Sequence, residues 1–152
     1  MKTTLFLITV GLATLHAADP AKPAFWSAAQ TREAVKKLPA KVNPERHLAT
    51  ERFMDSAFIA YRDGNGEAEL HEKQADLIFF HEGQGVVLVG GKMMEGRSTA
   101  PEEQRGKGIE GGVRYPVAAG DTLYIPPDTV HQFVVEPGQH FTATVVKFTP
   151  KP

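Results

Sequence analysis

The sequence of 152 residues contains no cysteine. This absence excludes disulfide bonds, thiolate metal ligands and thiol nucleophiles, so any metal must be bound through nitrogen and oxygen atoms. No apolar run approaches the roughly 20 residues that span a bilayer. Lys and Arg are scattered without a basic face and the formal net charge is −1, which argues against a nucleic-acid partner. The chain also lacks a glycine-rich phosphate loop before a helix and a Gly-x-Ser-x-Gly nucleophile turn.

The first 18 residues differ in composition from the rest of the chain. Lys2 supplies a positive charge, an apolar run of 11 residues covers positions 5–15, and small residues follow at Ala17 and Ala18. This pattern predicts a secretory signal peptide over residues 1–18. It therefore predicts export to the periplasm or the medium, with no membrane association after cleavage. A membrane-anchoring helix that is retained is the alternative interpretation.

Residues 19–50 are expected to form an N-terminal linker and one short helix. Composition predicts this helix over Trp26–Leu38, with Ser27 as its N-cap and Pro39 at its end. Its apolar positions are sparse, so the helix should pack on the outside of a single domain covering residues 51–150. A chain of this length can bury a proper hydrophobic core.

From Phe53 onward the hydrophobic pattern has the period of two that is typical of strands. We expect strands at Phe53–Arg62, Glu67–His71, Asp76–Glu82, Val86–Val89, Val113–Ala118, Thr122–Pro126, Val130–Val135 and Phe141–Phe148. The Asp-Gly and Asn-Gly pairs of residues 63–66 predict a hairpin, and Gly83-Gln84-Gly85 predicts a turn. The glycine-rich residues 90–112 are expected to form a long loop, either a lid or a mobile connection. The predicted fold class is all-β, a sandwich or barrel.

Two motifs concentrate the chemistry of the chain, Glu69-Leu-His71-x4-Asp76-x6-Gly83 and Gly120-x5-Pro126-x4-His131. They resemble the two motifs of the cupin superfamily, Gly-x5-His-x-His-x3,4-Glu-x6-Gly and Gly-x5-Pro-x-Gly-x2-His-x3-Asn. The resemblance extends over about Phe53 to Phe148. It implies a jelly-roll barrel, the double-stranded β-helix of the cupins.

The chain departs from the cupin motifs at four positions. Glu69 stands where the family has its first histidine, and Asp76 replaces the glutamate. In the second motif Asp128 replaces a glycine and Val135 replaces the final asparagine. The family's full set of three histidines and one glutamate is therefore absent.

The ligand set that the resemblance implies here is His71, Asp76 and His131. Two imidazoles and a carboxylate leave coordination positions open, and they suit a divalent transition metal such as Fe, Mn, Ni, Co, Cu or Zn. Positions 69 and 71 share one face of a strand, so Glu69 can be a further ligand or a general base. The alternative is structural: His71 ends a strand, Asp76 binds a turn amide and His131 hydrogen-bonds in the core.

Strand alternation also selects residues for the barrel interior. Ile78 and Phe80 share the parity of Asp76, and Phe133 shares that of His131. Together with Tyr124, these residues are expected to line a pocket, with packing in the core as the alternative for each.

Three further candidates have both a functional and a structural interpretation. Arg62 and Arg114 can hold an anionic substrate through bidentate hydrogen bonds, or they are solvated arginines at strand ends. His140 is a reserve metal ligand or a solvent-facing residue at a strand start. By alternation, His81 is expected on the surface.

Three functions are compatible with the sequence. The first is an exported cupin that binds a divalent transition metal and acts on a small polar molecule by oxygenase, isomerase or lyase chemistry. The second is a non-catalytic periplasmic protein that captures a small ligand in the same barrel. The third is a structural role, with a homodimer formed through strand edges. The fold alone does not choose among them.

Overall fold

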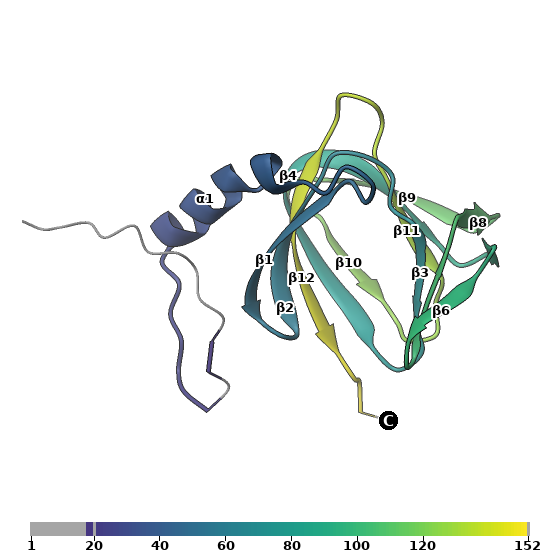
Figure 1. Ribbon diagram of the computed structural model, residues 1–152, viewed down its shortest axis with the longest axis horizontal. Coiled ribbons are helices and arrows are strands. Elements are labelled where there is room, and N and C mark those ends of the chain that lie inside the picture. The colour runs from purple at the N-terminus through teal and green to yellow at the C-terminus, as the bar shows by residue number, and fades with distance from the viewer. Residues whose placement is uncertain (1–17, 20, 152) are drawn as a thin grey trace, which may run out of the picture.

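The computed structural model describes residues 18, 19 and 21–151. The predicted signal peptide lies outside the described residues except for Ala18, and it stays a prediction. The described chain forms an N-terminal helix followed by strands, and the strands pair in antiparallel fashion (Figure 1). The predicted all-β class with one short N-terminal helix is confirmed.

Helix α1 (Ala28–Lys37) is fixed at its N-terminus by a capping box. The Ser27 hydroxyl accepts a hydrogen bond from the Gln30 amide, and the Gln30 side-chain oxygen accepts one from the Ser27 amide. A 3-10 turn at Pro39–Lys41 follows. The helix predicted over Trp26–Leu38 is therefore confirmed, with slightly shorter ends. Among the described helices, none has the length and apolar composition needed to cross a membrane.

The helix lies outside the strands, next to β1 (Leu48–Met54) and β2 (Ala57–Arg62) (Figure 1). Leu38, directly after α1, is fully buried in a small cluster with Ala49 and Ile59. The helical segment thus covers one face of the β1–β2 pair and leaves the other face to the interior of the barrel.

The remaining strands follow in chain order and curl into two walls. They are β3 (Ala68–His71), β4 (Ala75–Val89), β5 (Lys92–Met94), β6 (Arg97–Ala100), β7 (Glu103–Gly106), β8 (Gly108–Glu110), β9 (Val113–Ala118), β10 (Thr122–Ile125), β11 (His131–Val134) and β12 (Phe141–Phe148). The first wall consists of β1, β2, β12, β10 and the first half of β4. The second consists of β9, β11, β3, β7, β6 and the second half of β4. A separate ribbon pairs β5 with β8.

The strands in which apolar and polar residues alternate regularly lie where the sequence predicts them. Val113–Ala118 and Phe141–Phe148 are confirmed with the same bounds, and the strands at 67–71, 122–126 and 130–135 are confirmed with shorter ends. The single strand predicted at Phe53–Arg62 is wrong, because the chain reverses at residues 55–56 between β1 and β2.

The hairpin predicted at residues 63–66 is also wrong. The Gly66 amide donates to the carbonyl of Phe133, and the Asn65 side chain accepts from the Val135 amide. These bonds attach the segment to the end of β11. The chain therefore crosses from the first wall to the second instead of folding back on itself.

The turn predicted at Gly83-Gln84-Gly85 is replaced by a bend inside the continuous strand β4. Gly83 has a φ of 73°, in the left-handed region that glycine adopts without strain. Just before it, the pairing with β12 skips His81, which makes a bulge. The bulge and the glycine let one strand belong to both walls.

The long loop predicted at residues 90–112 is wrong as well, because the four short strands β5 to β8 occupy this segment. β7 pairs with β3 and carries β6 on its outer edge. The β6–β7 part of the segment therefore extends the second wall. The β6–β7 pair is formed mostly by polar and charged side chains, and the β5–β8 ribbon has a single apolar pair, Met93 with Ile109, so a search for apolar periodicity does not find these strands.

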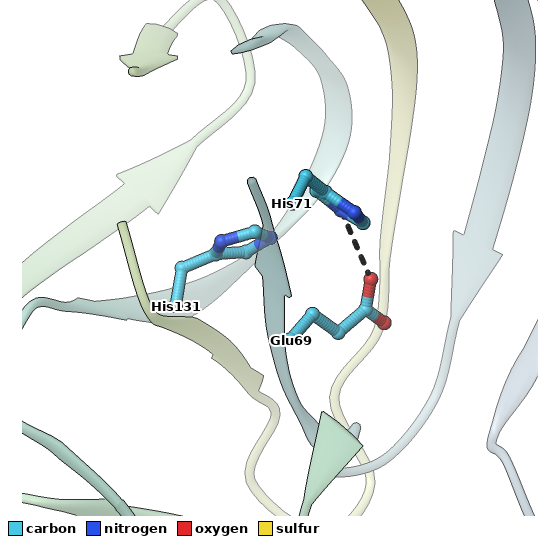
Figure 2. Close-up of side chains that lie close together, drawn as sticks. All are labelled: Glu69, His71 and His131. Carbon is cyan, nitrogen blue, oxygen red and sulfur yellow. Dashed lines mark ion pairs between the residues drawn. The ribbon is translucent and has the colours of Figure 1, made fainter. Parts of the chain in front are cut away.

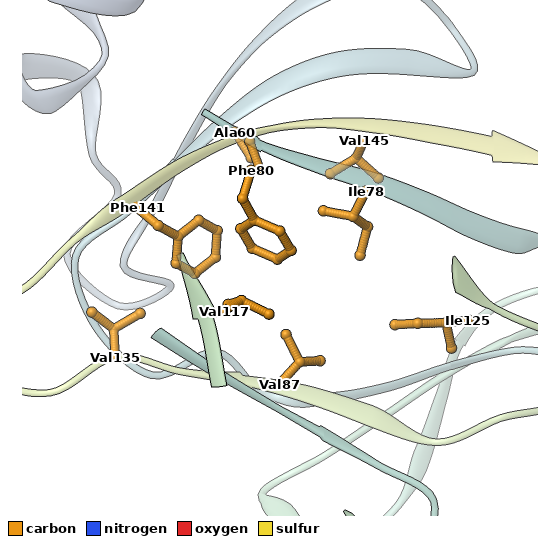
Figure 3. Close-up of a cluster of buried hydrophobic side chains, with 10 residues drawn as sticks. Ala60, Ile78, Phe80, Val87, Val117, Ile125, Val135, Phe141 and Val145 are labelled. Atoms are coloured by element: carbon orange, nitrogen blue, oxygen red, sulfur yellow. The ribbon is translucent and has the colours of Figure 1, made fainter. Parts of the chain in front are cut away.

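Ten buried apolar residues form the main core between the walls (Figure 3). They are Ala60, Ile78, Phe80, Val87, Val117, Ile125, Val135, Phe141, Ala143 and Val145. They come from both walls, so the core joins elements that are far apart in the sequence. At about 25 cal/mol for each Å² of apolar surface removed from water, this burial is the main stabilising contribution to the barrel.

Candidate metal centre

A cavity of about 320 Å³ opens between the two walls. Part of its apolar lining belongs to the core, namely Ala60, Ile78, Phe141, Ala143 and Val145. Its charged lining includes the carboxylates and cations Glu69, Asp76, Glu103, Arg62, Arg105 and Lys147. The motif residues and part of the hydrophobic core therefore line the same cavity.

Cross-strand register in the second wall arranges the motif side chains in rows. His131 of β11 pairs with Glu69 of β3, which pairs with Arg105 of β7. In the next row on the same face, His71 pairs with Glu103. Figure 2 shows Glu69, His71 and His131 converging from β3 and β11. One donor atom from each of these three residues lies within 4.8 Å of the other two.

His131 is oriented by its backbone environment. Its Nδ1 lies 3.1 Å from the carbonyl oxygen of Thr129, and because a carbonyl only accepts, Nδ1 carries the proton. The ring is 1% exposed. Its Nε2 is buried and has no hydrogen-bond partner among the described residues. An imidazole held through one nitrogen, with the other directed at a cluster of donors, is typical of a metal ligand.

His71 is held between a lysine and three carboxylates, those of Glu69, Asp76 and Glu103. Its Nε2 lies 2.7 Å from Nζ of Lys147 and 3.6 Å from Oε2 of Glu69, and its Nδ1 lies 3.6 Å from Oε1 of Glu103. Burial and the Lys147 ammonium lower the pKa of His71 and outweigh the nearby carboxylates. The ring is therefore neutral at pH 7, and its Nε2 accepts a hydrogen bond from the ammonium.

Asp76 is 3% exposed and lies between the lysine and both histidines. Its Oδ1 accepts a hydrogen bond from Lys147 at 2.7 Å. Its Oδ2 lies 3.5 Å from Nε2 of His131 and 3.7 Å from Nε2 of His71. β12 pairs with β4 so that Lys147 is directly opposite Asp76, which makes this a cross-strand ion pair.

Glu69 is paired with Arg105, whose Nη1 lies 2.8 Å from the Glu69 Oε1. Burial by itself raises the pKa of the Glu69 carboxyl, but Arg105, His131 and Lys147 together lower it to about 2. A carboxylate with so low a pKa is a weak base near neutral pH. The arrangement therefore favours Glu69 as an anionic ligand over the general base that the sequence left open.

Among the predicted pocket residues, Ile78 and Phe133 line the cavity, and Phe80 is buried in the core. The prediction for Tyr124 is wrong, because this side chain is 49% exposed. Ile125, the next residue along β10, is buried. Strand alternation therefore turns Tyr124 outward.

The remaining candidates lie away from the centre. His81 is exposed, as predicted, and His140 stacks on Tyr61, with its Nε2 3.9 Å from Glu82. Arg114 is exposed on β9, whereas Arg62 is buried. Arg114 is therefore a solvated arginine, as the structural alternative predicted, whereas Arg62 is not.

Sequence reasoning missed Lys147, Arg105 and Glu103. A signal for Lys147 was present, because it follows Phe141, Ala143 and Val145 at the spacing of one strand face, so a lysine continues an apolar row. No comparable signal marked Arg105 and Glu103. They lie in the segment without apolar periodicity, and only the pairing of β7 with β3 brings them to the site.

The residues present fit a divalent transition metal. Glu69, His71 and His131 supply one oxygen and two nitrogen donors at mutual distances that one ion can bridge. The buried and unpartnered Nε2 of His131 is the strongest sign of such an ion. Lys147 lies against Nε2 of His71, so a metal binds that nitrogen only when the lysine side chain moves aside.

Comparison with known proteins assigns the domain. A family model described as the AraC-like ligand binding domain matches residues 67–151, from β3 to the residues after β12. This range covers more than half of the chain and contains Glu69, His71, Asp76 and His131. None of the curated proteins matches the chain.

Several solved structures have a similar fold. TT1209 from Thermus thermophilus is 21% identical with a TM-score of 0.51, over 78% of this chain and 95% of that chain. The polyketide cyclase RemF from Streptomyces resistomycificus is 18% identical with a TM-score of 0.47, over 72% and 74%. A cupin protein, BF4112 from Bacteroides fragilis, is 11% identical with a TM-score of 0.43, over 70% and 80%. The predicted resemblance to cupins and the jelly-roll class are confirmed. The chain belongs to the family of AraC-like ligand binding domains, a cupin-type domain.

Proposed function

We propose that the protein binds one divalent transition metal through Glu69, His71 and His131 and acts there on a small polar molecule. The observation that carries this proposal is the unpartnered Nε2 of His131, buried among carboxylate and imidazole donors. Asp76 is the further ligand, because its Oδ2 already lies within 3.7 Å of both imidazoles. The ion is Fe, Mn, Ni, Co, Cu or Zn, the metals that suit nitrogen and oxygen donors.

The bound metal supplies Lewis-acid chemistry toward a substrate oxygen, or a site for dioxygen, which corresponds to isomerase or lyase and to oxygenase reactions. The protein's own groups position the reactants. Arg105 keeps Glu69 ionised, and Thr129 orients His131. Ile78 and Phe133 exclude water from one side of the cavity. Lys147 supplies an ammonium that donates hydrogen bonds beside the reacting atoms.

Metal analysis of the purified protein tests the proposal. We expect about one transition-metal ion per chain in the wild type, and loss of that ion in the double variant His71→Ala, His131→Ala. The matched control is His81→Ala, His140→Ala, which removes two histidines that lie outside the cavity and should keep the metal. A wild-type protein that stays metal-free after incubation with salts of all six metals would show that the proposal is wrong.

Export is part of the proposed function. Its support is the positive charge at Lys2, the apolar run at positions 5–15 and the small residues at 17 and 18. Fractionation of cells that produce the full chain, followed by mass measurement of the exported form, tests it. The expected result is a protein outside the cytoplasm that has lost about 18 residues.

The second candidate is a binding protein without catalysis. Lys147 favours it, because this cation already satisfies Asp76 and His71 without any metal. The match to a ligand binding domain is a second support. Oxygen uptake and product analysis with candidate substrates separate the two functions. Turnover that disappears in His131→Ala contradicts the binding protein, and ligand retention after EDTA treatment without turnover supports it.

A further inference from the structure

The charges that line the cavity are mostly paired with one another. Arg105 lies 2.8 Å from Glu69 and 2.9 Å from Glu103, and Lys147 lies 2.7 Å from Asp76. These contacts account for both cations and all three carboxylates of the candidate metal centre. Arg62, which lines the same cavity, has no part in them.

Arg62 is a buried cation that forms no direct ion pair among the described residues; Glu69, itself paired with Arg105, supplies the main opposing charge at longer range. The Arg62 side chain is 4% exposed at the end of β2. In the described part of the chain, no carboxylate oxygen lies within 4.0 Å of its guanidinium; its one side-chain hydrogen bond runs from Nη1 to the carbonyl of Arg46 at 3.1 Å. Burying a charge without a directly paired counter-ion is energetically costly. A buried guanidinium with no carboxylate in direct contact is suited to bind an added anion.

The guanidinium is held in a fixed place. It lies over the ring of Phe133, with its central carbon 5.5 Å from the ring centroid. On another side it packs against Gly66, where an added Cβ would come within 2.7 Å of Nη1. A guanidinium fixed on two sides loses little further conformational freedom when it binds a carboxylate through paired hydrogen bonds.

The remaining lining limits what kind of anion fits. Next to Arg62 the cavity is bordered by two apolar side chains, Phe133, over whose ring the guanidinium lies, and Phe141, which pairs with Arg62 across β12 and β2. Two more arginines, Arg46 and Arg52, line the cavity while exposed, and neither has a carboxylate within 4.0 Å among the described residues. Asp55 lines the cavity as well, so five cations face four carboxylates. This small excess of positive charge attracts anions toward the opening, and the apolar border favours an organic body over a fully hydrated ion.

We propose that Arg62 binds the carboxylate group of a small organic acid whose apolar part lies against Phe133 and Phe141. The proposal deepens the proposed function and rests on it, because it names the chemical class of the molecule that occupies the same cavity. The cavity of about 320 Å³ is at the small end of the range for ligand sites, roughly 300–1,000 Å³. Arg62 precedes residues 67–151, so it lies outside the segment that matches the family model.

Calorimetric titration with benzoate and with benzamide, at constant ionic strength, tests the assignment. The two probes have nearly the same shape, but only benzoate carries a carboxylate. We expect the wild type to bind benzoate at least tenfold more tightly than benzamide, and Arg62→Met to lose that preference. Arg114→Met, which removes an exposed arginine on β9, should keep it. Equal affinity for the two probes in the wild type, or a preference unchanged in Arg62→Met, overturns the proposal.

Thermal unfolding separates this role from a purely structural one. Met replaces a buried and unpaired charge with an apolar group of similar length, so Arg62→Met should unfold at the same temperature as the wild type or higher, and benzoate should no longer raise that temperature. A lower unfolding temperature together with an unchanged response to benzoate would mean that Arg62 is structural. Inorganic phosphate is the second probe, and a response to it as large as the response to benzoate would overturn the assignment to an organic carboxylate.

The same titrations on protein dialysed against EDTA separate this proposal from the proposed function. Benzoate binding that survives EDTA and depends on Arg62 supports the carboxylate site even if metal analysis finds no ion. Benzoate binding that requires the metal and is unchanged in Arg62→Met supports the metal centre and overturns the role of Arg62.

Discussion

Lys147 places a positive charge where the donors of the candidate metal centre converge. Its Nζ lies 2.7 Å from both the His71 Nε2 and the Asp76 Oδ1. In the absence of metal, this ammonium compensates the buried Asp76 carboxylate. With a metal present, the same ammonium repels the ion and blocks one nitrogen donor. We therefore expect this one residue to stabilise the metal-free cavity and to weaken metal binding.

The variant Lys147→Met should bind Zn²⁺ and Ni²⁺ more tightly than the wild type. Two unit charges about 4 Å apart interact by about 4 kcal/mol at an effective dielectric of about 20. After solvent screening, a gain of roughly tenfold or more in affinity remains. The substitution also frees His71 Nε2 and Asp76 Oδ1 for the ion. Calorimetric titration with each metal measures the change.

The matched control for this prediction is Lys92→Met, which removes an exposed lysine on β5. It should leave both affinities unchanged. In EDTA, Lys147→Met should be less stable than the wild type, because Asp76 then lacks its cation. An affinity equal to that of the wild type would show that Lys147 does not compete with the metal.

The candidate ligands themselves could be predicted from the sequence, but of the charges around them only Lys147 left a signal there, as a lysine that continues the apolar row of a strand. His71, Asp76 and His131 occupy motif positions, so their convergence follows from the resemblance. Arg105 and Lys147 enter through the register of β7 and β12 with β3 and β4. That register is set by the packing of the whole barrel, and local patterns do not contain it.

At the scale of elements, β4 connects the chemistry to the architecture. It carries Asp76 in its first half and pairs with β11, the strand of His131, in its second half. The bend at Gly83 makes this dual membership possible. A turn glycine and a bend glycine look alike in a sequence, since both need a positive φ, which is why one long strand was predicted as two.

Gly83→Ala should be strongly destabilising. An added Cβ would come 1.9 Å from the carbonyl oxygen of His140, a backbone atom that cannot move independently. The positive φ adds a cost of about 1 kcal/mol. We therefore expect a loss of about 3 kcal/mol or more in the free energy of unfolding, measured by urea denaturation.

Gly138→Ala is the matched control for the bend. Gly138 has a φ of 80°, close to that of Gly83, but no atom within 4 Å of the added Cβ. The free energy of unfolding of Gly138→Ala should fall by only about 1 kcal/mol, which is the conformational cost of the positive φ. If Gly83→Ala and Gly138→Ala lost the same free energy of unfolding, the close contact between residue 83 and His140 would not be the cause of the destabilisation.

At the scale of the whole molecule, the general fold was more predictable than the path of the chain. Alternation in strands such as Phe141–Phe148 indicated an all-β barrel. The crossing at residues 63–66 and the charged strands β6 and β7 escaped prediction, because long-range hydrogen bonds and ion pairs determine them. Of these unpredicted elements, β7 supplies Glu103 and Arg105 to the cavity.

Glu69 links this charged part to the stability of the entire barrel. Its row runs from His131 on β11 through Glu69 on β3 to Arg105 on β7. The pKa of the Glu69 carboxyl is about 2, below its ordinary value of 4.5. A lowered pKa in the folded state stabilises that state above the unfolded pKa, and the contribution disappears as the pH falls through the folded pKa.

The difference in stability between the wild type and Glu69→Gln should therefore depend on pH. In EDTA it should be on the order of 3 kcal/mol at about pH 7, constant down to about pH 4.5, and progressively smaller toward about pH 2. Arg105 keeps Glu103 as a partner in the variant. Urea denaturation at a series of pH values measures this difference. The exposed Glu136→Gln should show almost no difference at any pH. If the stability lost in Glu69→Gln were the same at pH 3 as at pH 7, packing and not the ionised carboxylate would be responsible.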